Sequence, residues 1–389
     1  MIKRILFATV VALFSFPAFG QNSDIQVERF QSSISILKSV FFNNQNSSFY
    51  DLDDVARKMP KGPNRVAAFK LQALGKVYTD YDGKDGKEFF KDSIRFEFKG
   101  LEDAIGEVDK WDSIIEDLKD RNPIPEKKLE TAKIRYEVAK AILKFFLTQE
   151  EGYIETSFVE ENLSEHNEKF IKNIKKGLKK SKYENNPWFP FTSDSKLARI
   201  EQDLNQYDWK PYDKDRKYVV KHLIDHMENL EKTRFNFSLL EDTETEKGLH
   251  EYRREVRWFA MKAGVINGTI SFLDDWNNPN DDGDDCPNLA LKGIVKDEAL
   301  KESKYSKLPQ SPFPEREAVC GISRCLFYKI SDIVAKVGDI KDEVERGNFA
   351  GGNGNVTPPD AQKAVEEIYR EMVKLELLPQ IRYQLNKCL

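Results

Sequence analysis

The chain has 389 residues, of which 33% are charged and 40% are hydrophobic. This composition is typical of a folded protein and argues against a disordered, collagen-like or polytopic membrane chain. The 61 basic and 66 acidic side chains give a net charge of -5. The chain therefore lacks the global positive field that gathers nucleic acid, and an anion site must be a local concentration of positive charge.

Residues 1–20 are typical of a secretory signal peptide. Lys3 and Arg4 precede the apolar run 5–16, and small residues follow at the positions that a signal peptidase requires. We expect cleavage before Gln21 and export, and loss of the two basic residues takes the net charge from -5 to -7. An uncleaved membrane anchor is the alternative, but the run is shorter than the roughly 18 residues that span a bilayer. No later segment resembles a transmembrane helix.

The four cysteines are Cys286, Cys320, Cys325 and Cys388. An even number in an oxidising compartment predicts two disulfides. One pairing would close a short loop between Cys320 and Cys325 and a long one between the other two, but all three pairings stay open. The spacing fits no zinc template and no redox motif.

Apolar residues recur mostly every three or four positions, which predicts helices rather than strands. The clearest windows are 26–44, 65–79, 87–119, 126–149, 157–182, 194–206, 213–240, 245–273, 317–346 and 360–386. About ten helices with short connections predict an all-α fold of two packed helical bundles with an extra C-terminal helix.

The domain boundaries follow the breaks in this helical pattern. The segment 184–193 is rich in Pro and aromatic residues, and we divide the chain there into halves 21–190 and 191–346. A Gly- and Asn-rich stretch predicts a flexible linker over 347–359. A Thr-Pro-Pro-Asp start then predicts the C-terminal helix 360–389.

The helix predicted over 245–273 carries an arrangement of charge. On a helical wheel one face is apolar, and it is formed by Leu249, Tyr252, Val256, Phe259, Ala260 and Ala263. Four basic residues gather on one flank of that face: His250, Arg253, Arg254 and Arg257. A stripe beside the core is partly desolvated, and Arg offers forked donors that suit phosphate, so the stripe predicts an anion site. Internal ion pairs with Glu251 and Glu255 are the alternative.

The run Leu-His-x-x-Arg-Arg-x-x-Arg-Trp, residues 249–258, resembles the motif of the CHAD family, the histidine-marked α-helical domains. In the first half, residues 64–76 resemble the counterpart helix, and residues 98–111 resemble the helix that follows it. The resemblance spans roughly 50–345, although only about 17 residues are motif-like.

This resemblance implies two bundles related by a pseudo-twofold axis, with basic helices that line a channel for inorganic polyphosphate. The implied ligand-binding residues are His250, Arg253, Arg254 and Arg257 in the second half, and Lys70, Arg65 and Lys76 in the first. The first half carries no His at the motif position.

Three weaker signals have ordinary explanations. The lysine-rich run 169–182 predicts a solvated helix face, with contact to an anionic polymer or membrane surface as the alternative. The acidic loop 274–285 has some spacing of a calcium loop, but Leu289 stands where the last ligand belongs. His222 and His226 are four residues apart, as helical metal ligands are, yet no third ligand accompanies them.

We therefore expect an exported, periplasmic or secreted protein that binds polyphosphate or another phosphate-rich polyanion and has no cofactor. Its partners are not expected to include a specific nucleic acid. The alternative is an envelope interaction or scaffold protein with no small ligand, in which the stripe pairs internally. An enzyme is less favoured because the sequence has no catalytic constellation and no phosphate loop. The carboxylates within reach of the stripe distinguish the first two hypotheses.

Overall fold

The structure is a computed structural model, and the ranges that it describes are 25–45, 52–148, 196–239, 243, 245–266, 269–273, 321–350 and 358–389. Four sequence predictions lie outside these ranges: the signal peptide at 1–20, the lysine-rich run at 169–182, the segment 184–193 that divides the halves, and the acidic loop at 274–285. The described chain is all-α, as predicted, apart from two strands of three residues each.

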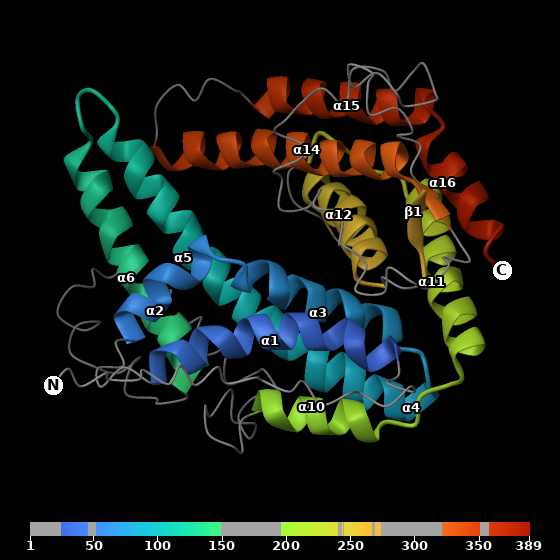
Figure 1. The fold of residues 1–389 in the computed structure, drawn as a ribbon. Coiled ribbons are helices and arrows are strands. Elements are labelled where there is room, and N and C mark those ends of the chain that lie inside the picture. The colour runs from blue at the N-terminus through green and yellow to red at the C-terminus, as the bar shows by residue number, and fades with distance from the viewer. Residues whose placement is uncertain are drawn as a thin grey trace, which may run out of the picture.

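Among the described elements up to residue 148, the helix Asn64–Tyr78 contacts several of the others. In chain order they are α1 (Ile25–Gln45), α2 (Leu52–Lys58), the 3-10 helix η1 (Met59–Lys61), α3 (Asn64–Tyr78), α4 (Gly83–Gly86), the π-helix η2 (Lys87–Phe96), α5 (Glu97–Lys119) and α6 (Glu126–Thr148). α3 is buried along most of its length and contacts α1, η2, α5 and α12. α5 and α6 pack against each other beside it (Figure 1).

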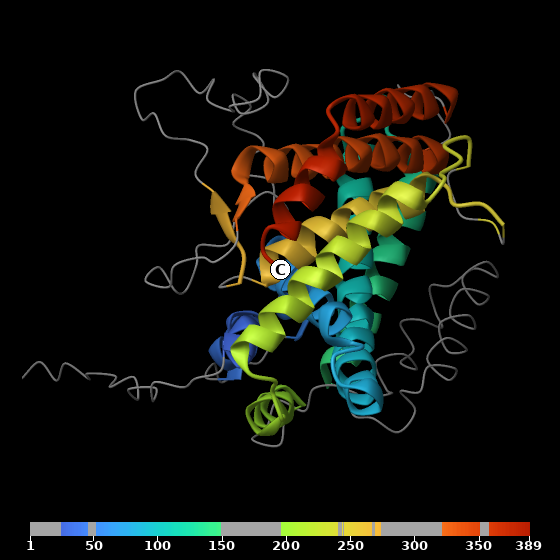
Figure 2. The ribbon, with the colours of Figure 1, turned by 90° about the vertical axis from the view of Figure 1, so that its right-hand side faces the viewer.

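The remaining elements are α10 (Lys196–Gln206), α11 (Tyr212–Lys232), α12 (Leu249–Val265), β1 (Ser271–Leu273), β2 (Gly321–Ser323), α14 (Arg324–Ala350), α15 (Pro358–Lys374) and α16 (Leu377–Asn386). They contact the first part mainly through α10, which lies beside α1, and α12, which lies beside α3 (Figure 1). α14 lies beside α15, and α12 lies between α14 and α3 (Figures 1 and 2). None of the described helices combines the length and apolarity needed to cross a bilayer.

The apolar face predicted for α12 is confirmed, because all six of its residues are buried. Trp258 extends this contact to α3, where its ring meets Phe69 edge-on at a centroid distance of 6.0 Å. One connected cluster of buried side chains joins residues from α1 to α16. The contact between α3 and α12 therefore lies inside a core that the two parts of the chain share.

Two predicted helices end earlier than their windows. α11 ends at Lys232 because the chain then becomes extended, and Phe235 forms a β-bridge with Lys247. α12 ends at Val265, and its predicted continuation contains β1 instead, which pairs in parallel with β2. These pairings join residues distant in sequence, so helical periodicity does not reveal them.

The predicted C-terminal helix 360–389 is wrong as a single element. It is two helices, and the break lies at Leu375 and at Glu376, whose φ is 49°. Pro379 explains the break, since an unbroken helix would need its missing N–H to bond the carbonyl of Leu375. The side chain of Gln380 donates to that carbonyl instead, at 2.7 Å.

The linker predicted over 347–359 is also shorter than expected. α14 continues to Ala350 and α15 begins at Pro358, so only residues 351–357 remain between them, outside the described ranges. Cys388 is disulfide-bonded. The pairing of the four cysteines stays a prediction.

A buried polar group joins α1, α3 and α11. Arg29 Nη1 lies 3.0 Å from Asp215 Oδ2, and both side chains are almost completely buried. Arg29 also donates to the hydroxyl of Tyr78 and to Thr269. Removal of either charged partner would leave the other buried without compensation, which is costly in a medium of low dielectric constant.

We expect Asp215→Ala to lower the free energy of unfolding by about 3–5 kcal/mol, as measured by urea denaturation. The control is Lys58→Ala, which removes an exposed ion pair with Asp54 and should cost less than about 1 kcal/mol. Replacing Arg29 and Asp215 together by Leu should cost less than Asp215→Ala alone, because no uncompensated charge remains. Equal losses for Asp215→Ala and Lys58→Ala would contradict this interpretation.

Candidate functional site

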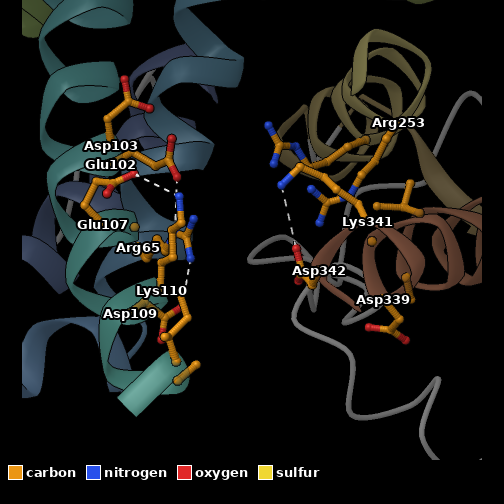
Figure 3. A pocket seen from close by; sticks show the side chains of 17 residues that line it. Arg65, Glu102, Asp103, Glu107, Asp109, Lys110, Arg253, Asp339, Lys341 and Asp342 are labelled. Atoms are coloured by element: carbon orange, nitrogen blue, oxygen red, sulfur yellow. Dashed lines mark hydrogen bonds and ion pairs between the residues drawn. The ribbon is translucent and has the colours of Figure 1, made fainter. Parts of the chain in front are cut away.

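A cleft of about 890 Å³ lies between α5 on one side and α12 with α14 on the other (Figure 3). Its lining includes five basic side chains, Arg65, Lys110, Arg253, Arg257 and Lys341. It also includes six acidic side chains, Glu102, Asp103, Glu107, Asp109, Asp339 and Asp342. The cleft is therefore rich in charge of both signs.

The wall formed by α5 neutralises the arginine that faces it. Arg65, from α3, donates from Nε to Glu102 at 3.1 Å and from Nη1 to Asp109 at 2.8 Å. The two acids are seven residues apart, so they lie two turns apart on one face of α5. Burial raises the pKa of Glu102, and the positive charge of Arg65 opposes that rise.

The opposite wall holds Arg253 differently. Arg253, from α12, lies against Gly338 of α14, where an added Cβ would stand 2.7 Å from its Nη2. Its Nε is buried and has no hydrogen-bond partner among the described residues, and none of their carboxylates forms an ion pair with it. In Figure 3, Arg253 and Lys341 stand on the wall that faces Arg65.

The two walls repeat one packing arrangement. Arg65 lies against Gly106 of α5 as Arg253 lies against Gly338 of α14, and an added Cβ at Gly106 would also stand 2.7 Å from the Nη2 of its arginine. Both glycines occur in the same four-residue pattern, which is apolar, Gly, acidic, apolar. The two runs are Ile105-Gly106-Glu107-Val108 and Val337-Gly338-Asp339-Ile340.

The repeat differs at the positions that pair with the arginine. Asp109 lies three residues after Gly106, and Lys341 lies three residues after Gly338. Glu102 lies four residues before the first glycine, and Val334 takes that position before the second. A Val and a Lys thus replace the two carboxylates, which explains why Arg253 lacks the ion pairs that Arg65 makes.

Arg257, also from α12, lines the cleft as well. Its guanidinium carbon is 4.6 Å from the centroid of the Phe69 ring and 5.7 Å from that of Trp258. Stacking on an aromatic face holds a guanidinium in place. Arg65, Arg253 and Arg257 are thus the predicted residues that the structure brings together in the cleft.

The other predicted ligand residues do not line the cleft. Arg254 is partly exposed and forms an ion pair with Glu251, one turn before it. His250 and Lys70 are partly buried, and burial lowers the pKa of Lys70. Lys76 lies over the ring of Trp258 at 4.2 Å, in a separate group of basic residues. Of the seven expected residues, Arg65, Arg253 and Arg257 therefore line this cleft and the other four do not.

Sequence reasoning did not identify Glu102, Asp109, Gly338 or Lys341 as parts of the site. A signal was present, because Gly106 and Gly338 sit in the same short pattern inside two predicted helices. A glycine in a helix interior is unfavourable unless a neighbour approaches closely, and here the neighbour is an arginine.

His222 and His226 lie close to the basic side chains of Lys76 and Lys262. Burial, reinforced by the charge of Lys262, lowers the pKa of each to about 3. His226 Nδ1 lies 3.2 Å from the ammonium of Lys262, and its Nε2 lies 3.0 Å from the carbonyl of Glu255. The described residues contain no cluster of three metal-ligating side chains.

Comparisons of the chain with protein-family models, with curated proteins and with solved structures find no match. The resemblance to the CHAD family therefore rests on the residues quoted above and stays a prediction.

The two glycines provide a matched pair of substitutions. Gly106→Ala and Gly338→Ala both place a methyl group against the tip of an arginine, and both gain up to about 1 kcal/mol of helix propensity. Only Gly106→Ala disturbs two ion pairs, so we expect it to be about 1–3 kcal/mol less stable than Gly338→Ala. Urea denaturation measures the difference, and equal stabilities would show that the ion pairs of Arg65 contribute nothing.

Proposed function

We propose that this is an exported, non-enzymatic binding protein that takes a polyanion, polyphosphate or another phosphate-rich ligand, on the α12–α14 wall of the cleft. The observation that carries the proposal is Arg253, a guanidinium that borders the cleft and has no carboxylate partner among the described residues. Such a group retains its full capacity for a forked interaction with phosphate.

The neighbours of Arg253 support an anion on this wall. Lys341 and Arg257 line the same cleft and add positive charge. Arg253 is partly buried, so its attraction for an anion is less weakened by water than that of an exposed side chain. Arg253 and Arg257 are the primary contacts in this proposal, and Lys341 is a secondary one.

The acids of the cleft oppose a polyanion less than their number suggests. Most already have a basic partner: Glu102 and Asp109 with Arg65, Asp103 with Lys99, Glu107 with Lys110, and Asp342 with Lys341. They still repel phosphate at longer range. We therefore expect weak, strongly salt-dependent binding that is confined to the α12–α14 wall.

An envelope interaction or scaffold protein with no small ligand is the second candidate. Two observations favour it: the six acids of the cleft outnumber its five bases, and Arg65 and Arg254 are already neutralised. In this second candidate function the paired charges hold the helices in register, and the cleft binds no ligand.

The test compares polyphosphate binding by the wild-type chain and by Arg253→Ala/Arg257→Ala, using calorimetry at several salt concentrations. We expect the double variant to bind at least about tenfold more weakly, because each charged hydrogen bond contributes about 1.5–3 kcal/mol. The slope of log affinity against log salt should fall by about two, one for each phosphate contact removed.

The matched control is Arg370→Ala, which removes an exposed arginine that pairs with Glu366. The helical circular dichroism of all variants should match that of the wild type. Equal binding by the double variant would reject the proposed site, and no saturable binding by the wild type would favour the scaffold.

A further inference from the structure

A second group of basic side chains lies where α3, η2, α11 and α12 meet. Its members are Lys76 from α3, Arg95 from η2, His222 and His226 from α11, and Arg254 and Lys262 from α12. The carboxylates that accompany them are Glu255 and Glu251, both on α12. None of these residues lines the cleft, so we treat this basic cluster as a separate feature.

Lys262 is the buried lysine of the basic cluster. Its side chain is only 6% exposed. The hydrogen bond that it makes is with His226 Nδ1, at 3.2 Å, and it forms no ion pair with any described carboxylate. Burial lowers its pKa to about 8, although the charge of Glu255 partly opposes the shift. An ammonium group with three donors thus has one partner.

Lys76 completes the cluster from α3. Its Nζ lies over the ring of Trp258 at 4.2 Å, and no described carboxylate forms an ion pair with it. Burial, followed by repulsion from Arg95, Lys262 and Arg254, lowers its pKa to about 7. Basic groups that lower one another's pKa are held close together without sufficient negative charge between them.

The two histidines lie beside the lysines without adding charge. The pKa of each is lowered to about 3, so both are neutral at pH 7. The 3.0 Å contact with the Glu255 carbonyl places the proton of His226 on Nε2, so Nδ1 accepts from Lys262. His222 Nε2 is buried and has no hydrogen-bond partner among the described residues, and it is available as a further donor.

We propose that this basic cluster binds a compact divalent oxyanion of the phosphate or sulfate class. Lys76 and Lys262 form no ion pair with a described carboxylate and carry two positive charges when both are protonated, which matches a dianion. Lys76, Lys262 and Arg254 are the contacts, and Arg95 adds positive potential. The partial exposure of Lys76 and Arg254 provides the approach from solvent.

This site predicts a definite pH dependence. A bound dianion favours the charged form of each lysine, so it raises the pKa of Lys76 and Lys262 toward the ordinary value, and binding takes up protons. Affinity is then highest below about pH 7, where both lysines are already protonated. It falls as the pH rises through 7 and 8, because the free protein loses those protons. The two histidines do not change charge in this interval, because the pKa of each is about 3.

The experiment measures sulfate binding by calorimetry from pH 6 to pH 9, at constant ionic strength set with chloride. Sulfate remains a dianion throughout, so any change in affinity reports the protein. We expect saturable binding to one site that weakens by roughly tenfold or more from pH 7 to pH 9. Orthophosphate at pH 8 should bind the same site. Affinity that does not change with pH would overturn the proposal.

Three variants test the residues. Lys262→Met and Lys76→Met should each weaken sulfate binding at pH 6.5 by at least about tenfold. Lys76→Arg should keep the binding but show a shallower pH dependence, because arginine does not lose its proton. Lys262→Met removes a buried charge that lacks a carboxylate partner, so its melting temperature should be no lower than that of the wild type. Undiminished binding by both Met variants would overturn the proposal.

Two controls separate this site from the cleft and from general charge. Lys84→Met removes an exposed lysine and should not change sulfate affinity. Arg253→Ala/Arg257→Ala, which tests the cleft, should also leave it unchanged. A loss of sulfate binding in that double variant would place the anion in the cleft and reject the basic cluster, while the proposed polyanion site would stand.

Discussion

The contact between α3 and α12 is the constraint on which the rest of the structure depends. Phe69 and Trp258 meet edge-on at its centre. One residue from the cleft and one from the basic cluster pack against these rings. Arg257 stacks on Phe69 toward the cleft, and Lys76 lies over Trp258 toward the basic cluster. The aromatic pair therefore buries apolar surface and at the same time separates two groups of cations that would repel each other if they were merged.

The helices of the described ranges follow from the sequence, because burial of one face repeats every three to four residues whatever lies opposite. The ends of α11 and α12 do not follow, since the Phe235–Lys247 bridge and the β1–β2 pair depend on distant residues. The apolar face of α12 and its basic flank were predictable from the same periodicity. The different surroundings of the basic residues on that flank were not predictable. Arg253 and Arg254 are 100° apart on the helix, and neighbouring residues determine that Arg253 contacts α14 whereas Arg254 pairs with Glu251.

The repeated Arg–Gly packing shows how one arrangement serves two purposes. On α5 the arginine is neutralised by Glu102 and Asp109, and the pair holds α3 against α5. On α14 the same positions carry Val334 and Lys341, so Arg253 lies against Gly338 without the ion pairs that Arg65 makes. A side chain that is held by shape and not by countercharge is oriented without being neutralised, which is the condition that an anion site requires.

The short parallel pair of β1 and β2 has a topological consequence. Phe272 lies opposite Ile322, so the two ends of the stretch between the strands lie at neighbouring points. Because the two ends of the intervening stretch are fixed side by side, its length can change in evolution or by engineering without altering the path of any helix, and the entropic cost grows only with the logarithm of the residues added. The strand pair thus makes this position a suitable place for an insertion.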